Sequence, residues 1–205
     1  LIARISPARR TTFHTTAQGK GRTVTMRVLA VGAGGVGTSA ALIAARRDFF
    51  DVWVVSDYDA ERAAAVVEGL DDDRFVAAQI DASSAEAVAD LCRAHAITHV
   101  LNVVDPRYVM SIFEGAFRAG ADYLDTAMSL SRPHPDHPYA QVGVKLGDEQ
   151  FARSEEWAQH GRLPLCGMGV EPGLADVFAR YAADHLFTEI DEIGIRDGAN
   201  LVLLA

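Results

Sequence analysis

Residues 31–37 read Val-Gly-Ala-Gly-Gly-Val-Gly, and this stretch decides the fold. Three of its glycines, Gly32, Gly34 and Gly37, have the spacing Gly-x-Gly-x-x-Gly, with a β-branched run before them and an Ala-rich run after them. That context predicts a strand, a tight turn and a helix. The glycines allow the turn, the close approach of a ligand to the backbone, and tight helix–strand packing. The start of such a helix offers free N–H groups and partial positive charge to phosphates.

Short apolar runs and longer Ala-rich runs alternate from Met26 onward. The alternation predicts an α/β protein with a doubly wound parallel sheet, the Rossmann dinucleotide-binding fold. The predicted strands span residues 26–31, 52–56, 75–80, 99–104, 123–124 and 163–166. The predicted helices span residues 36–47, 60–69, 108–119, 148–160 and 173–185. One more helix is expected after Ser83 or Ser84, with Glu86 three residues beyond Ser83 as a capping box requires.

The chain divides into three predicted parts. Residues 1–25 contain five basic side chains and no acid. We expect them to be an unstructured N-terminal extension, with Met26 as the natural start, and an organelle transit peptide is the alternative. Residues 26–166 form the predicted Rossmann domain. Residues 167–205 are predicted to be a helix returning to that domain, followed by the start of a truncated α+β substrate domain, because 190–195 and 200–204 resemble strands.

Composition excludes several classes of protein. The chain of 205 residues has 28 acidic and 19 basic side chains and a net charge of −9, which argues against nonspecific nucleic-acid binding. No apolar run approaches the length of a membrane span. Two cysteines are too few for a disulfide scaffold. His134 and His137 lie in a proline-rich loop without further ligands at metal-site spacing, so no metal is expected. A cytoplasmic enzyme is the resulting prediction.

The second predicted strand is followed by Asp57, which lies 25 residues after Gly32. An acid at this place accepts hydrogen bonds from the ribose hydroxyls of the adenosine half of a dinucleotide, and it repels the 2′-phosphate of NADP. Asp57 therefore favours NAD, although Arg62 is close enough in sequence to compensate for that phosphate, so NADP stays possible. A loop acid or helix cap is the alternative for Asp57, and Asp59 is the better cap.

Several further stretches resemble the saccharopine dehydrogenase superfamily. The stretches are Gly32–Gly37, Ser56–Asp59, Ile80–Ala82, Asn102–Pro106, Tyr123–Thr126 and Gly167–Asp176. The resemblance covers the chain from about Met26 onward. It implies a Rossmann domain, an NAD(P) cofactor, and hydride transfer at a C–N bond of an amino acid or amino-acid conjugate.

The resemblance also implies roles for individual residues. Gly35 and Val36 are expected to bind the cofactor together with the three glycines of the turn. Asp81 and Ala82 would flank the adenine, with helix capping as the alternative for Asp81. The three residues from 102 to 104, namely Asn102, Val103 and Val104, would run beneath the ribose on the nicotinamide side.

Asp125, at the end of the fifth predicted strand, is the candidate catalytic residue, as an orienting or proton-handling carboxylate. A cap or structural acid is its alternative. The expected partners are a small amino-acid-like substrate and, through the missing second domain, a second copy of the chain. Two other readings stay open: a nucleotide-sensing module with a Rossmann fold, and an inactive family member that acts as a scaffold.

Overall fold

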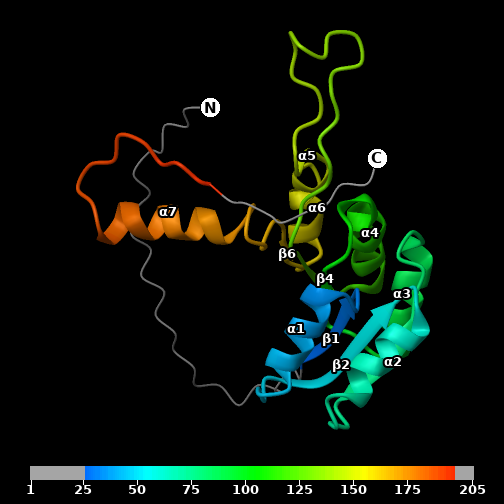
Figure 1. Cartoon of the computed structure of the whole chain (residues 1–205). Coiled ribbons are helices and arrows are strands. Elements are labelled where there is room, and N and C mark those ends of the chain that lie inside the picture. The colour runs from blue at the N-terminus through cyan, green and yellow to red at the C-terminus, as the bar shows by residue number, and fades with distance from the viewer. Residues whose placement is uncertain (1–25, 197–205) are drawn as a thin grey trace, which may run out of the picture.

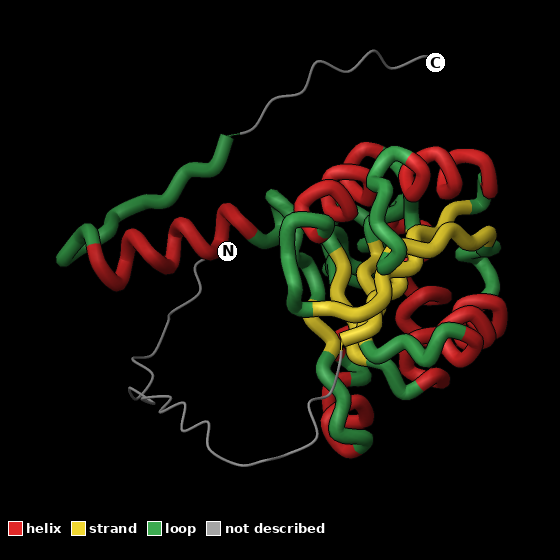
Figure 2. Tube along the Cα trace, turned by 90° about the horizontal axis from the view of Figure 1, so that it is seen from below, coloured by secondary structure: helices red, strands yellow, loops and turns green. Residues whose placement is uncertain are grey.

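The computed structural model describes residues 26–196. It contains one parallel sheet of six strands between two layers of helices (Figures 1 and 2). The strand order is β3-β2-β1-β4-β5-β6. The strands are β1 (Met26–Val31), β2 (Phe50–Asp57), β3 (Phe75–Gln79), β4 (His99–Asn102), β5 (Asp122–Asp125) and β6 (Pro164–Leu165). This order confirms the predicted doubly wound fold, in which a crevice forms where the strand order reverses, between β1 and β4.

The helices connect these strands in sequence. They are α1 (Gly35–Ala44), α2 (Ala60–Glu68), α3 (Ala85–Ala94), α4 (Val109–Ala119), α5 (Asp148–Phe151), α6 (Ser154–Gln159) and α7 (Leu174–His185), with a 3₁₀ turn (Pro106–Tyr108) before α4. Helices α1 and α2 cover one face of the sheet, and α3, α4 and α6 cover the other. Each of these long connections returns the chain to a parallel strand, as the crossover rule requires.

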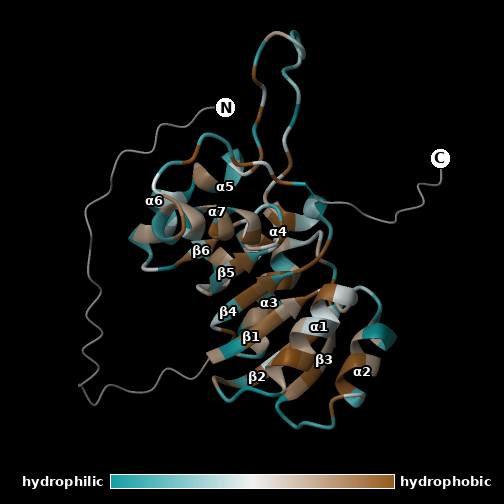
Figure 3. Cartoon of the chain, turned by 60° about the vertical axis from the view of Figure 1, so that its left-hand side comes forward, coloured by the Kyte–Doolittle hydropathy of each residue, from teal (hydrophilic) through white to brown (hydrophobic). Residues whose placement is uncertain are grey.

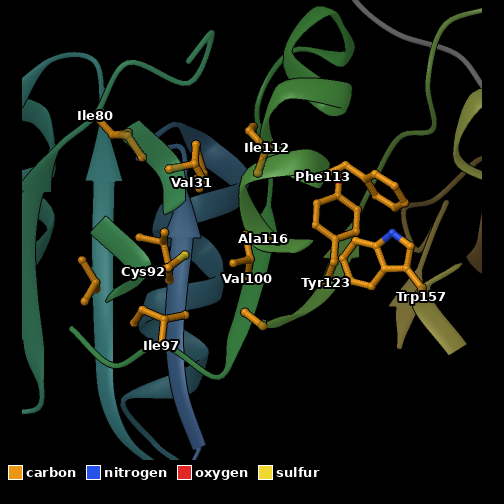
Figure 4. Packing of buried hydrophobic residues seen from close by; sticks show 14 residues of the cluster. Val31, Ile80, Cys92, Ile97, Val100, Ile112, Phe113, Ala116, Tyr123 and Trp157 are labelled. Carbon is orange, nitrogen blue, oxygen red and sulfur yellow. The ribbon is translucent and has the colours of Figure 1, made fainter. Parts of the chain in front are cut away.

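The side chains of β1 show how the two layers share the sheet. Val28 and Ala30 belong to the cluster under α1 and α2, and Leu29 and Val31 to the cluster under α3 and α4. The period of two follows from the pleat of a strand, and burial on both faces explains why residues 28–31 of β1 are all apolar. Figure 4 shows the second cluster, and Figure 3 shows that hydrophobic residues concentrate along the central strands.

Helices α3 and α4 pack unusually close together at Gly115. A Cβ atom there would lie 2.5 Å from the Cβ of Val88 and 2.7 Å from the carbonyl oxygen of Ala85. Phe113, from the same turn of α4, has its ring centroid 4.7 Å from that of Trp157, whose side chain is fully buried (Figure 4). Trp157 thereby packs α6 against the edge of the core.

Of the two serines considered as the cap of α3, Ser84 is confirmed. The capping box expected between Ser83 and Glu86 and the single helix expected over residues 148–160 were wrong. The helix after β3 is capped by Ser84, whose Oγ accepts a hydrogen bond from the backbone N–H of Ala87 at 3.2 Å. Ser83 instead donates to Asp81. Residues 148–160 form two short helices, because Ser154 Oγ donates to the last carbonyl of α5, a bond that competes with helix continuation.

Residues 190–195 are not a strand, since no other strand of the described chain pairs with them. The predicted strand at 200–204 and the predicted extension at 1–25 lie outside the described residues.

Helix α7 has no buried residue and extends away from the sheet (Figures 1 and 2). Between residues 26 and 196 no helix is both long and apolar enough to cross a membrane.

One of the segments that leave the sheet lies between β5 and α5. Residues 126–147, called here the 126–147 excursion, project beyond the carboxyl ends of the strands (Figure 1). Arg132 and Val144 pair as an antiparallel bridge within it. At its base, the N–H of Gly147 donates to the carbonyl of Ser129 at 2.9 Å. The excursion contains the proline-rich segment that the sequence predicted as a loop.

Candidate cofactor-binding site

The glycine-rich turn leads from β1 into α1. Gly32 has a φ of +111°, and a Cβ atom there would lie 2.6 Å from Cγ1 of Val104. A Cβ atom at Gly37 would collide with the carbonyl oxygen of Gly32. The predicted structural roles of these two glycines, the tight turn and the close helix–strand contact, are therefore confirmed.

Gly34 stands at the N-cap of α1 with extended backbone angles, φ −75° and ψ −165°. A Cβ atom at Gly34 would meet no protein atom within 4 Å. No packing requirement within the described chain explains a glycine there. The open space beside the first N–H groups of a helix is suited to a bound phosphate.

The side chain of Asp57 stabilises this turn through hydrogen bonds. Its Oδ2 accepts a hydrogen bond from the N–H of Ala33 at 2.8 Å, and its Oδ1 accepts one from the N–H of Asp59 at 3.0 Å. Nη1 of Arg62 lies 3.3 Å from the same Oδ1. The Asp57 side chain is only 10% exposed, whereas that of Arg62 is 56% exposed. Asp59 is the N-cap of α2, as predicted, with Oδ1 accepting from the N–H groups of Glu61 and Arg62.

These residues border a pocket of about 400 Å³. The pocket lies at the carboxyl ends of β1, β2, β3 and β4, where the doubly wound fold binds ligands. Seven residues of the predicted cofactor set line it: Gly32, Gly34, Asp57, Asp81, Ala82, Val103 and Val104. The other four, Gly35, Val36, Gly37 and Asn102, are not among the lining residues.

Asp81 forms a tight turn at the rim of this pocket. Its Oδ1 accepts hydrogen bonds from the backbone N–H of Ser83 at 2.9 Å and from Ser83 Oγ at 2.6 Å. These bonds hold the pKa of Asp81 below its usual range, so the side chain is an anion at neutral pH. The alternative considered for Asp81, capping of the next helix, is not observed, because Ser84 caps α3 and Asp81 closes the turn at Ser83 instead.

Sequence reasoning missed six lining residues as site residues: Val31, Tyr58, Ile80, Ser83, Asp105 and Tyr108. Arg62, considered from the sequence as a partner for a 2′-phosphate, also lines the pocket. Tyr58 is 79% exposed although it is aromatic. Its position directly after Asp57 was the available signal, because the residues that follow a strand lie at the carboxyl edge of the sheet. Tyr108 belongs to the 3₁₀ turn before α4, and no motif indicated it.

The candidate catalytic residue Asp125 does not line this pocket. It is fully buried at the end of β5, and its oxygens accept hydrogen bonds from three donors. Tyr123 Oη donates to Oδ2 at 2.9 Å and Gln150 Nε2 donates to it at 2.7 Å, while the N–H of Gly167 donates to Oδ1 at 2.6 Å. Burial raises the pKa of Asp125, and the three bonds oppose that rise. Asn102 is also buried and donates from Nδ2 to Tyr123 Oη at 2.9 Å.

His134 and His137 lie in the 126–147 excursion with their rings stacked 5.8 Å apart. Nδ1 of His134 accepts hydrogen bonds from the N–H groups of Asp136 and His137. Within residues 26–196, no group of three or more histidine, cysteine, aspartate or glutamate side chains is placed to hold a metal ion.

The doubly wound sheet, the glycine turn at the start of α1 and the acid at the end of β2 define a Rossmann dinucleotide-binding domain. A family model described as the saccharopine dehydrogenase NADP binding domain matches residues 28–163. The chain belongs to this family, and its cofactor class is therefore NAD(P).

Two curated relatives extend this finding. The chain is 28% identical over 181 residues to carboxynorspermidine synthase of Vibrio cholerae, covering 84% of this chain and 43% of the relative. It is 30% identical over 172 residues to carboxyaminopropylagmatine dehydrogenase of Synechocystis, covering 83% of this chain and 41% of the relative. The chain thus spans less than half the length of the curated relatives it matches.

Among solved structures, apo saccharopine dehydrogenase (L-Glu forming) from Saccharomyces cerevisiae superposes with a TM-score of 0.59 at 16% identity. That match covers 78% of this chain and 31% of the other. At this identity the likeness supports the fold alone.

Proposed function

We propose that the chain is the cofactor-binding part of an NAD(P)-dependent oxidoreductase that transfers hydride at a C–N bond of an amino acid or amino-acid conjugate. The observation that carries the proposal is the pocket in which the open N-terminus of α1 and the carboxylate of Asp57 face the same space. The nicotinamide supplies the hydride chemistry when it is bound, and the protein residues orient it. The names of the two relatives support the substrate class, because both describe amines that carry a carboxyl group.

NAD is the proposed preference within this cofactor class. Asp57 and Asp81 line the pocket together with the guanidinium of Arg62, and a third carboxylate, that of Asp59, lies beside Arg62. Arg62 is already paired, 3.3 Å from Asp57 and 3.8 Å from Asp59, so a 2′-phosphate would have to compete with both acids for it. That balance of charge favours two ribose hydroxyls over a phosphate.

The test is a titration of the chain with NADH and with NADPH, followed by nicotinamide fluorescence. We expect tighter binding of NADH, and a loss of about tenfold or more in Asp57→Ala, since a charge-assisted hydrogen bond is worth about 1.5–3 kcal/mol. Arg62→Gln should weaken NADPH and leave NADH nearly unchanged. Arg107→Gln is the matched control, because Arg107 is also paired with an aspartate, Asp105, but does not line the pocket.

Binding of neither nucleotide would refute the proposal. The hydride-transfer part is tested on protein that includes the substrate domain, by adding NAD⁺ and carboxynorspermidine and following reduced nicotinamide. Formation of NADH supports an oxidoreductase. Tight NADH binding without any reduction would contradict this part and favour a nucleotide-sensing module.

The proposal includes a cytoplasmic homodimer whose second domain starts after residue 166. Two free thiols, Cys92 and Cys166, suit a reducing compartment. The exposed apolar side chains of Val177, Phe178 and Tyr181 on α7 suit a helix that packs on something outside the sheet. Sedimentation of the protein that includes the second domain should give the mass of two copies, and the mass of one copy would refute the dimer.

A further inference from the structure

Four polar side chains beneath the pocket form one buried hydrogen-bond network. They are Asn102, Tyr123, Asp125 and Gln150, and each is at most 2% exposed. Tyr123 Oη accepts from Asn102 and donates to Asp125, and Gln150 donates to the same oxygen of Asp125. Burying so many polar groups in a core costs stability unless each is satisfied, and here each has a partner. We call this set the Asp125 network.

One end of the Asp125 network reaches the cofactor pocket. Oδ1 of Asn102 accepts a hydrogen bond from the N–H of Val104 at 3.2 Å, which fixes the path of the chain just after β4. Val103 and Val104 line the pocket. They also press against Gly32, since a Cβ atom there would lie 2.6 Å from the Val104 side chain and 3.1 Å from the Val103 carbonyl. The network therefore sets the floor of the pocket next to the glycine turn.

The other end reaches two segments beyond the sheet. Oε1 of Gln150 accepts from the N–H of Ser129 at 2.8 Å, at the base of the 126–147 excursion. Oδ1 of Asp125 accepts from the N–H of Gly167 at 2.6 Å, and the carbonyl oxygen of Asp125 accepts from the N–H of Met168 at 2.8 Å. Residues 167–173 lead into α7. One carboxylate thus joins the pocket floor to both segments that leave the Rossmann sheet.

The chemistry of the site calls for a carboxylate at position 125. Three donors converge on Asp125, and an ionised carboxylate accepts all of them without presenting a hydrogen of its own. An asparagine would turn an amide N–H₂ toward the amide of Gln150. Gln150 cannot resolve that conflict by flipping, because its oxygen is needed by the N–H of Ser129.

We propose that Asp125 is a positioning residue that holds Val103 and Val104 in the position that supports the nicotinamide half of the cofactor. Through the same hydrogen bonds it couples the position of these two residues to the 126–147 excursion and to residues 167–173. This inference rests on the proposed function. It assigns Asp125 an action through its neighbours, because its carboxylate is buried away from the pocket with its acceptor sites occupied.

The test compares two nucleotides in Asp125→Asn. NADH spans the whole pocket, whereas ADP probes only the adenosine and pyrophosphate half at Asp57 and the glycine turn. We expect NADH to bind about tenfold more weakly than to the wild type, the equivalent of one unsatisfied buried polar contact, and ADP to bind within about twofold. If Asp125 only stabilised the fold, Asp125→Asn would weaken the binding of NADH and of ADP by the same factor.

Two further variants sharpen the comparison. Gln150→Glu combined with Asp125→Asn restores an acceptor opposite the new amide and keeps one for Ser129, so NADH affinity should recover in part. Val88→Ala is the matched control, because Val88 is fully buried on α3 and has no part in the network. It should lower the melting temperature and leave the ratio of NADH to ADP affinity unchanged.

Equal losses for NADH and ADP, or no loss in a folded Asp125→Asn protein, would overturn the positioning role. If Asp125→Asn does not fold, Tyr123→Phe cuts the link between Asn102 and Asp125 without changing charge, and the same selective loss of NADH affinity is required of it. Wild-type protein that binds neither nucleotide would refute the proposed function itself. Wild-type binding without a selective loss in the variants would refute the positioning role alone.

Discussion

Gly34→Ala should separate binding from folding. The backbone at Gly34 is in the extended region, open to alanine, and the added methyl group would meet no protein atom within 4 Å. The substitution therefore creates no clash. The unfolded chain becomes less flexible, which stabilises the protein by about 0.4–1 kcal/mol, and this gain offsets the cost of placing alanine at a helix N-cap, so the stability should change little. The methyl group would stand in the pocket, which Gly34 lines.

The loss of affinity can be worked out from contact distances. A pyrophosphate oxygen that accepts from a backbone N–H lies about 2.9 Å from the nitrogen. A methyl group on the neighbouring Cα needs about 3.5 Å from that oxygen, so the phosphate must retreat. Losing one or two charge-assisted hydrogen bonds of about 1.5–3 kcal/mol each weakens NADH binding at least tenfold.

The assay pairs an NADH titration with a thermal melt. Gly35→Ala is the control, because a Cβ atom there also meets no protein atom within 4 Å but Gly35 does not line the pocket. Both variants should melt close to the wild-type temperature, and only Gly34→Ala should lose affinity. An unchanged dissociation constant in Gly34→Ala would refute the placement of the pyrophosphate at this turn.

Three further outcomes are expected. Gly115→Ala should lower the free energy of unfolding by about 1–3 kcal/mol although alanine favours helices, because its Cβ would lie 2.5 Å from that of Val88; an unchanged denaturation midpoint would contradict the tight α3–α4 contact. Trp157→Ala should cost about 3–5 kcal/mol by the same measurement, and a loss below about 1 kcal/mol would show that Trp157 does not anchor α6. Burial, and secondarily the charge of Asp125, raise the pKa of the Cys166 thiol from 9.0 to about 12. Alkylation of Cys166 by iodoacetamide near neutral pH should therefore be about a thousandfold slower than in the unfolded chain, and its rate should rise about tenfold per pH unit. Alkylation at the rate of the unfolded chain would contradict this environment.

The sequence predicted those parts of the site that depend on local chemistry. Gly32, Gly34 and Gly37 carry a fixed spacing between a strand and a helix, and Asp57 follows the next strand. The tight turn and the close helix–strand contact require Gly32 and Gly37, and the chemistry of a dinucleotide calls for Gly34 and Asp57, so the sequence alone is enough to place them. The parallel sheet followed for the same reason, from the period of the apolar runs.

The environment of Asp125 could not be predicted, because its partners Gln150 and Gly167 lie 25 and 42 residues away along the chain. Only the completed sheet brings them together. The false strand at 190–195 has the opposite cause: its residues have the composition of a strand, but a strand also needs a neighbour to pair with. Tyr58 and Tyr108 were missed since their loops meet only at the edge of the folded sheet.

The hydrogen bond from the N–H of Ala33 to Asp57 has a consequence for how this domain can evolve or be engineered. The residue that would read the ribose is also the residue that holds the glycine turn in shape. Replacing Asp57 to admit a 2′-phosphate would therefore remove a hydrogen bond that stabilises the turn at the pyrophosphate. A gain in selectivity for NADP would bring a loss in affinity for both nucleotides. Arg62, half exposed and outside that bond, is the position where cofactor choice can change at small cost to the rest of the site.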